Sequence, residues 1–227
     1  MTQPDSSPAP ALSTPAPAAP DHLAQTLSAT PACIIHAGNM LGEGPRWHAQ
    51  EGRLYWVDIA QQQLHRWHSQ TGAHDVRMFD APIACFAFRA AGGLVLGMKD
   101  GCALMDDWAD TPRPFGEQML AGRPHHRMND GRTDPSGRFW LGSQNGAKDV
   151  ADATLYRLDG DGAVHIIEGG MMTCNGAAFN ADGTRFHHAN TPSHAVRAYD
   201  VDATTGTLSR QRILHQFAVG VGPGLGR

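Results

Sequence analysis

The chain has 227 residues, of which 41% are hydrophobic and 18% charged, and its formal net charge is −4 at pH 7. This composition is typical of a soluble globular protein with a substantial core. The mild negative charge and the lack of Lys/Arg runs argue against a nucleic-acid partner. The apolar stretches are too short to span a bilayer, so we expect no membrane partner either.

Residues 1–30 differ in composition from the rest of the chain, because prolines alternate there with Ala, Ser and Thr. Such a segment cannot bury enough apolar surface to offset the entropy of ordering, so we expect a disordered tail. It has neither the basic start nor the apolar centre of a secretion signal. The sequence therefore predicts a cytoplasmic protein.

Four cysteines lie far apart, and no two have the Cys-x-x-Cys spacing. This pattern favours reduced thiols over a disulfide framework or a zinc site. The four positions are Cys33, Cys85, Cys102 and Cys174.

Residues 31–217 contain short apolar strands punctuated by glycine turns, and four of these turns recur at intervals of 41, 44 and 46 residues. A period of roughly 40–50 residues with about four strands each is the pattern of a β-propeller blade. An ordinary β-sandwich is the alternative. We predict an all-β fold with antiparallel blades at 43–79, 84–119, 128–168 and 174–214, and no substantial helix. The hairpin glycines are Gly52, Gly93, Gly137 and Gly183.

The repeat also indicates a site. Counting back eight or nine residues from the hairpin glycine reaches Glu43, Asn129 and Asn175 in three repeats, and Cys85 in the second. Equivalent positions at the start of the innermost strands surround the channel of a propeller. Oxygen donors there suit a divalent cation: Ca²⁺, Mg²⁺ or Mn²⁺, with Zn²⁺ also open. Taken singly, Glu43 could be a solvated loop acid and the two asparagines turn residues; the shared register favours a functional role.

Several long motifs occur in one order along the chain. They are Leu-Gly-Glu-Gly-Pro-Arg-Trp at 41–47, Tyr-Trp-Val-Asp-Ile at 55–59, Arg-Met-Asn-Asp-Gly-Arg-Thr-Asp-Pro-Ser-Gly-Arg-Phe-Trp-Leu-Gly at 127–142, and Cys-Asn-Gly at 174–176. Together they resemble the senescence marker protein/gluconolactonase/regucalcin family, from about Cys33 to about Phe217. The resemblance implies a monomeric six-bladed propeller that holds one divalent cation and hydrolyses a small sugar lactone.

By the same resemblance, Glu43 and Asn175 match metal ligands, while Arg127 and Asn129 match substrate-binding residues. The chemistry agrees: a cation can polarise a lactone carbonyl, and Arg127 offers a fork of donors to its oxygens. A surface ion pair is the alternative for Arg127. A propeller that serves only as a binding scaffold is the alternative for the whole chain, since this fold hosts many functions.

The chain departs from the family pattern at two places. Family members often carry an acid a few residues after the Phe-Trp-Leu-Gly strand, where this chain has Ala147. The resemblance also implies an aspartate after Phe217 that is both ligand and general base, whereas residues 218–227 are glycine-rich and contain no acid. Six blades need about 270–300 residues, and 197 follow the tail. We therefore expect a truncated or frame-shifted propeller of four to five blades with an irregular end at 218–227, and its catalytic base stays unassigned.

Overall fold

The computed structural model describes residues 30–218. The predicted tail at 1–30 and the predicted irregular end at 218–227 lie outside the described residues, apart from Thr30 and Ala218. Contacts along the chain divide the described residues into two units, 30–37 and 38–218. In the first unit, residues 30–37 form no regular structure and Cys33 is exposed.

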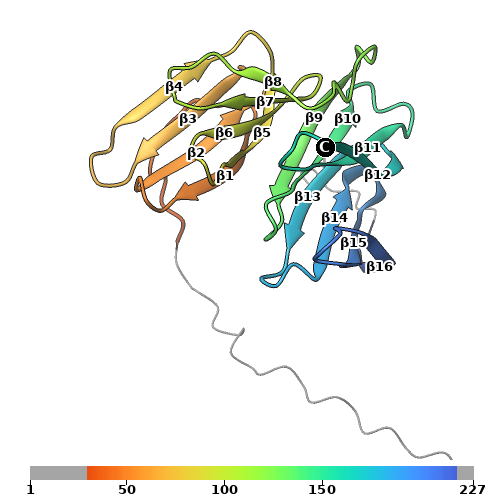
Figure 1. The fold of residues 1–227 in the computed structure, drawn as a ribbon. Helices are drawn as coiled ribbons and strands as arrows, with labels where there is room; N and C mark the ends of the chain where they lie inside the picture. Colours follow the sequence, from red (N-terminus) through yellow and green to blue (C-terminus); the bar gives the residue numbers. More distant parts are fainter. Residues whose placement is uncertain (1–29, 219–227) are drawn as a thin grey trace, which may run out of the picture. The chain divides into compact units, whose positions relative to one another are not determined.

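The described residues of the second unit form sixteen β-strands arranged in four antiparallel sheets (Figure 1). Each sheet has four strands in chain order, every strand pairing with the next one along the sequence. The first sheet consists of β1 (Gly42–His48), β2 (Arg53–Asp58), β3 (Gln63–His68) and β4 (His74–Met78), and the second of β5 (Ile83–Phe88), β6 (Leu94–Met98), β7 (Cys102–Met105) and β8 (Arg113–Phe115). The third consists of β9 (His126–Thr133), β10 (Phe139–Asn145), β11 (Ala153–Leu158) and β12 (Val164–Met171), and the fourth of β13 (Cys174–Phe179), β14 (Arg185–Asn190), β15 (Ala195–Val201) and β16 (Leu208–Gln216).

The four sheets match the predicted ranges to within a few residues, and their separateness excludes a two-sheet sandwich. The four glycines predicted in the first hairpins all have positive φ, between 62° and 85°. Glycine reaches this left-handed region without the steric cost that a Cβ brings. Within residues 30–218, the helical structure is one 3₁₀ turn at Thr191–Ser193, and no helix there could cross a membrane.

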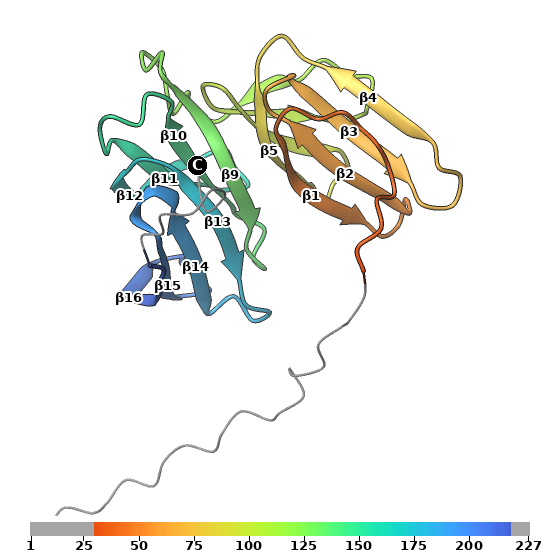
Figure 2. The ribbon, with the colours of Figure 1, turned by 180° about the vertical axis from the view of Figure 1, so that it is seen from behind.

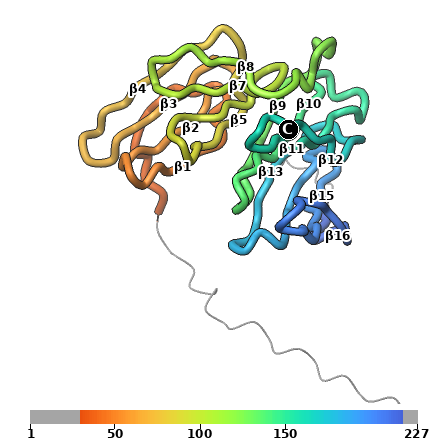
Figure 3. The backbone as a smooth tube through the Cα atoms, viewed as in Figure 1, coloured from red at the N-terminus to blue at the C-terminus, as the bar shows by residue number. Residues whose placement is uncertain are grey.

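The first strands of the sheets lie side by side in chain order: β5 contacts both β1 and β9, and β9 contacts β13. Two views from opposite sides show β9 next to β13 (Figures 1 and 2), and the backbone tube follows the same order (Figure 3). These four strands therefore form the inner edges of successive sheets, as the propeller pattern predicts.

Each inner strand carries a bulge, at which one extra residue interrupts its pairing with the second strand. The bulge follows Glu43 in β1 and Asn175 in β13, and it lies between Met128 and Gly131 in β9. Gly44 and Gly176 occupy equivalent places in two of these bulges, with φ of 60° and 63°. Bulges re-aim the neighbouring side chains and are frequent beside functional sites. The repeated Glu-Gly and Asn-Gly pairs thus produce one local geometry in two different sheets.

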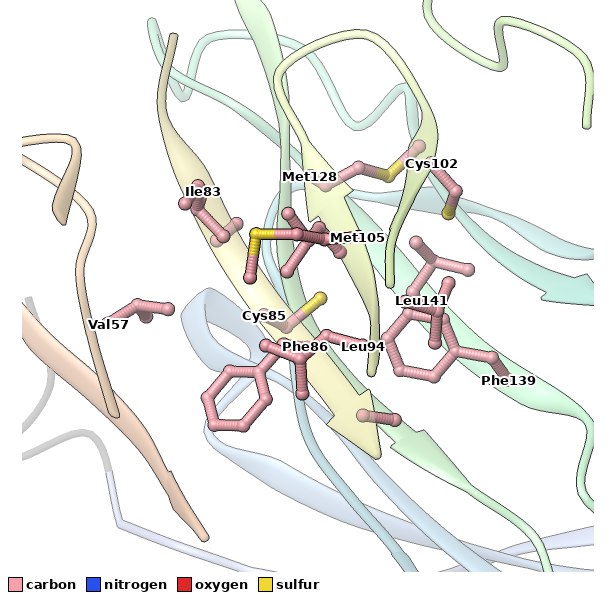
Figure 4. Close-up of a cluster of buried hydrophobic side chains, with 14 of the residues drawn as sticks. Val57, Ile83, Cys85, Phe86, Leu94, Cys102, Met105, Met128, Phe139 and Leu141 are labelled. Carbon is pink, nitrogen blue, oxygen red and sulfur yellow. The ribbon is translucent and has the colours of Figure 1, made fainter. Parts of the chain in front are cut away.

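A continuous apolar core packs the first three sheets against one another (Figure 4). Phe86 and Leu141 are fully buried in it, and burying such a side chain stabilises the fold by about 1.5–3 kcal/mol. A second cluster of buried residues, which includes Trp140, Phe186 and Tyr199, lies between the third and fourth sheets. These contacts fix the sheets that carry the candidate site residues.

Candidate functional site

A cavity of about 610 Å³ lies at the starts of the inner strands. All four residues predicted for the site line it: Glu43 from β1, Arg127 and Asn129 from β9, and Asn175 from β13. They are as many as 132 residues apart in the sequence. The common register of the sheets therefore brings together the side chains that the repeat singled out.

Glu43 is the last paired residue of β1 before the bulge, after which pairing with β2 resumes at Arg46. Its carboxylate accepts no hydrogen bond from the residues of the described part of the chain. Glu43 is exposed at the cavity wall, where partial desolvation raises its pKa, the nearby Asp130 carboxylate raises it further, and Arg127 lowers it. The charged form of Glu43 is thus only partly compensated, by solvent and by Arg127, and a bound cation would stabilise it further.

Arg127 is held in place by acceptors on its own sheet. Its Nη1 donates to the Met128 carbonyl oxygen and to Oδ1 of Asn129, both at 2.8 Å, and its Nη2 donates to Oε1 of Gln144 at 3.2 Å. No acidic side chain described in the structure forms an ion pair with Arg127, so the predicted alternative of a surface ion pair finds no support. Burial lowers the pKa of Arg127, while Cys85 and Glu43 raise it. The guanidinium is oriented but keeps donors for a ligand.

Asn129 is buried and uses both ends of its side chain. Oδ1 accepts from Arg127, and Nδ2 donates to the carbonyl oxygen of Cys174 in β13 at 2.9 Å. These bonds link the third sheet to the fourth and fix the Arg127 side chain. Asn129 therefore has a positioning function that the sequence did not reveal, beside its place on the cavity wall.

Asn175 projects from the fourth sheet at the register place that Glu43 has in the first, immediately before the bulge. Its Nδ2 donates to Oγ1 of Thr191 at 3.3 Å, and its Oδ1 accepts from the Gly176 amide at 3.1 Å. Because an amide oxygen has two lone pairs and Oδ1 accepts one hydrogen bond, one lone pair is left for a ligand.

The second repeat places no oxygen-bearing side chain at this position, as its cysteine predicts. Cys85 is fully buried and its Sγ approaches Gly97 and Gly131; a Cβ at these glycines would lie 2.5 Å and 3.0 Å from the sulfur. Burial raises the pKa of the Cys85 thiol well above its usual range. This residue belongs to the core and contributes no donor to the cavity.

Asp130 is a residue that sequence reasoning missed. Its Oδ1 accepts from the Gly131 amide at 2.8 Å, and its Oδ2 accepts from the Ala177 amide at 3.1 Å, which ties β9 to the bulge of β13. The bulge in β9 places Asn129 and Asp130 together opposite Gly142. Simple strand alternation assigns them to opposite faces, so the sequence pattern alone gave no reason to select both.

Lys148 is a second residue that the sequence analysis did not select. It follows β10 in the loop of residues 146–152 and lines the same cavity, together with Gln144. The adjacent position is Ala147, where the resemblance implies an acid. The cavity thus has a lysine beside the place at which a carboxylate is expected.

The ligand atoms of the cavity are of the type that a hard divalent cation prefers, since Glu43 offers carboxylate oxygens and Asn175 an amide oxygen. The raised pKa of Glu43 points in the same direction. No group of three or more His, Cys, Asp or Glu side chains in the described part of the chain could hold a metal. These two residues could therefore supply only part of a coordination shell.

Four-stranded sheets in sequential order, with polar side chains around a cavity at their inner strands, define an all-β protein of the propeller type. A calcium-binding protein, regucalcin, from Agrobacterium tumefaciens has this fold, with a TM-score of 0.73 at 24% sequence identity over 77% of this chain and 59% of that one. At this identity the likeness shows the fold alone. The family model described as "SMP-30/Gluconolactonase/LRE-like region" matches residues 41–224. The chain belongs to this family, as the sequence motifs predict.

Two relatives resemble the chain in sequence. A 6-deoxy-6-sulfogluconolactonase from Pseudomonas putida is 33% identical over 190 residues, which cover 84% of this chain and 65% of the relative. A pentonolactonase from Haloferax volcanii is 36% identical over 182 residues, covering 80% of this chain and 60% of the relative. The chain thus spans less than two thirds of the length of either lactonase.

Proposed function

We propose that the cavity belongs to a metal-dependent lactonase that hydrolyses a sugar lactone to the aldonic acid. The observation that carries the proposal is the meeting of Glu43, Arg127, Asn129 and Asn175 in one cavity. Two relatives with lactonase names support the reaction class. We further propose that the four described sheets are blades of a six-bladed propeller, as the family resemblance implies.

In this proposal Glu43 and Asn175 hold one divalent cation, Ca²⁺, Mg²⁺, Mn²⁺ or Zn²⁺, through their side-chain oxygens. When bound, the cation would supply Lewis-acid polarisation of the lactone carbonyl and lower the pKa of a bound water. Asp130 adds a negative charge near Glu43, which raises the pKa of Glu43 and would strengthen attraction of the cation.

Arg127 donates hydrogen bonds to the lactone oxygens and, after ring opening, to the product carboxylate. Its acceptors on Asn129 and Gln144 keep the guanidinium in place, so less side-chain entropy is lost when the substrate binds. The general base stays unassigned, because the aspartate implied by the resemblance would follow Phe217, and residues 218–227 contain no acid.

The test is proton release during hydrolysis of aldonolactones by the chain, first stripped with a chelator and then given each of the four cations. We expect activity to require one of them and to fall in Glu43→Gln and Arg127→Gln. Glu117→Gln, at an exposed position away from the cavity, is the matched control. Specific sugar-acid binding without turnover under any cation would instead support a non-catalytic scaffold.

A further inference from the structure

We infer that the ligand of this cavity carries an anionic group, a carboxylate, phosphate or sulfonate, at the end remote from its lactone carbonyl, and that Lys148 binds that group. The inference specifies the substrate class of the proposed lactonase and rests on that proposal for the reaction. Its binding component can be measured independently of turnover.

The loop that carries Lys148 is held by one buried side chain. Asn145 donates from Nδ2 to Oδ1 of Asp149, to the carbonyl oxygen of Val150 and to Oδ1 of Asp152, at 3.0–3.3 Å. Its Oδ1 accepts from the Ala147 amide at 2.9 Å. Four bonds from a side chain that is 4% exposed give the loop a defined path to the cavity.

The backbone at Lys148 is itself unusual. Its φ is 54°, in the left-handed region that non-glycine residues rarely adopt, and its amide donates to the Asn145 carbonyl oxygen at 3.2 Å. The strain is offset by the Asn145 bonds on either side. Glycine or asparagine is the usual residue in this conformation, but here the turn places a lysine at the cavity wall.

The acids next to Lys148 are engaged elsewhere. Asp149 accepts from Asn145, while Asp152 is hydrogen-bonded to Nε2 of His126 at 2.9 Å and forms an ion pair with Arg123 at 3.3 Å. Lys148 forms no ion pair with any residue of the described ranges. Lys148 is exposed at the edge of the cavity, so its ammonium is a solvated charge without a protein partner, available to a ligand.

Among the described residues that line the cavity, cationic side chains outnumber carboxylates. Glu43 is the single carboxylate among the described lining residues, whereas Arg127 and Lys148 are both cationic. If Glu43 binds a divalent cation, as proposed, both basic side chains are left for the ligand. An opened lactone has one carboxylate, which Arg127 can bind, so a second anionic group is the complement for Lys148.

The order of the lining residues along the cavity wall indicates where the second anionic group of the ligand would lie. Asn175 and Glu43 belong to the inner strands, Arg127 pairs in register with Gln144 of the next strand, and Lys148 lies beyond that strand's end. A lactone whose carbonyl lies near Glu43, Asn175 and Arg127 extends its far end past Gln144 towards this loop. For a hexonolactone the far end is C6.

The first experiment is titration calorimetry of the full chain with gluconate and glucarate, which differ by a carboxylate at C6. We expect glucarate to bind about threefold to fivefold more tightly, which is the gain typical of an ion pair with an exposed lysine. Lys148→Gln should remove the difference and Lys148→Arg should retain most of it. The chain has one other lysine, Lys99, which is next to Asp100 at 3.7 Å and does not line the cavity, so Lys99→Gln is the matched control.

The second experiment compares hydrolysis of gluconolactone with lactones that carry a C6 carboxylate, phosphate or sulfonate, and so identifies which anion is preferred. We expect Lys148→Gln to raise KM for the anionic lactones by about threefold to fivefold, and to change the neutral lactone less. Equal affinity for gluconate and glucarate, or the same preference in Lys148→Gln as in the parent, overturns the inference. Tight Lys148-dependent binding of glucarate without hydrolysis of any lactone supports the binding role and overturns the lactonase proposal alone.

Discussion

The side-chain amide of Asn129 donates to the carbonyl oxygen of Cys174 at 2.9 Å, in a buried bond between two different sheets. The same side chain accepts from Arg127 at 2.8 Å. One residue therefore couples the packing of the third sheet on the fourth to the orientation of the guanidinium in the cavity.

Replacing Asn129 by Ala should lower the free energy of unfolding by about 1–3 kcal/mol, because the Cys174 carbonyl oxygen loses its buried donor. Asn129→Asp keeps an oxygen for Arg127 but cannot donate to Cys174, so it separates the two functions. Urea denaturation gives the stability, and ligand titration gives the effect on the cavity. A reduced ligand affinity with an unchanged denaturation midpoint in both variants would contradict the linking role.

The bulge glycines permit a second prediction. Gly44 and Gly176 have left-handed φ, and a Cβ would meet no atom within 4 Å at Gly44 and only the Ala189 Cβ at 3.8 Å at Gly176. The cost of Gly44→Ala or Gly176→Ala is therefore backbone strain, about 1–2 kcal/mol each. Gly160 has open space and no left-handed φ, so Gly160→Ala should be neutral or slightly stabilising. Thermal melting of the three variants checks the contrast, and equal melting temperatures would refute it.

Much of the fold could be predicted from the spacing of turns. Hairpin glycines with a period of 41–46 residues identified the four sheets, because a turn that needs positive φ leaves a strong signal in the sequence. The same count found Glu43 and Asn175, since the number of residues from the inner strand's start to its hairpin is nearly constant.

The bulges and the loop could not be predicted in this way. An extra residue changes which side chains share a face, so Asp130 joins Asn129 near the cavity although the two are adjacent in sequence. Lys148 reaches the cavity because Asn145 folds the loop of residues 146–152 around its own amide group. Such bonds are tertiary in origin and have no periodic signature. The predicted metal and substrate roles of the four site residues stay predictions.

A third prediction concerns acid stability. His188 is 1% exposed, and burial lowers its pKa from 6.5 to about 4. Between these values the unfolded chain binds the proton and the folded chain does not, so stability is full above pH 6.5 and falls as the pH drops towards about 4. The loss is about 3 kcal/mol at 1.36 kcal/mol per pKa unit.

His188→Leu should abolish this part of the pH dependence. The carboxyl of Asp58, whose pKa is lowered to about 2 by hydrogen bonds although burial opposes the shift, affects stability only at lower pH. Denaturation midpoints measured across the window from pH 6.5 to 4 compare the two proteins. An identical slope in His188→Leu would show that other groups cause the acid sensitivity.

The last prediction concerns Glu43, whose pKa is raised by burial and by Asp130. A raised carboxyl pKa means that the folded state resists ionisation, so its stability contribution is present below the ordinary value of 4.5 and is lost as the pH rises through the higher folded value. Without a divalent cation, Glu43→Gln should therefore be more stable than the parent at neutral pH. The difference should vanish at acid pH below 4.5, where the parent is also uncharged.

A divalent cation should reverse that order, because binding to the folded state stabilises it by mass action. We expect calcium to raise the melting temperature of the parent most, that of Asn175→Ala less, and that of Glu43→Gln least, since the carboxylate carries the full negative charge. Melting curves with and without calcium at neutral pH make the comparison, with Glu117→Gln as the control. If calcium raises the melting temperature of Glu43→Gln as much as that of the parent, Glu43 is not a ligand and the cation site must be sought elsewhere.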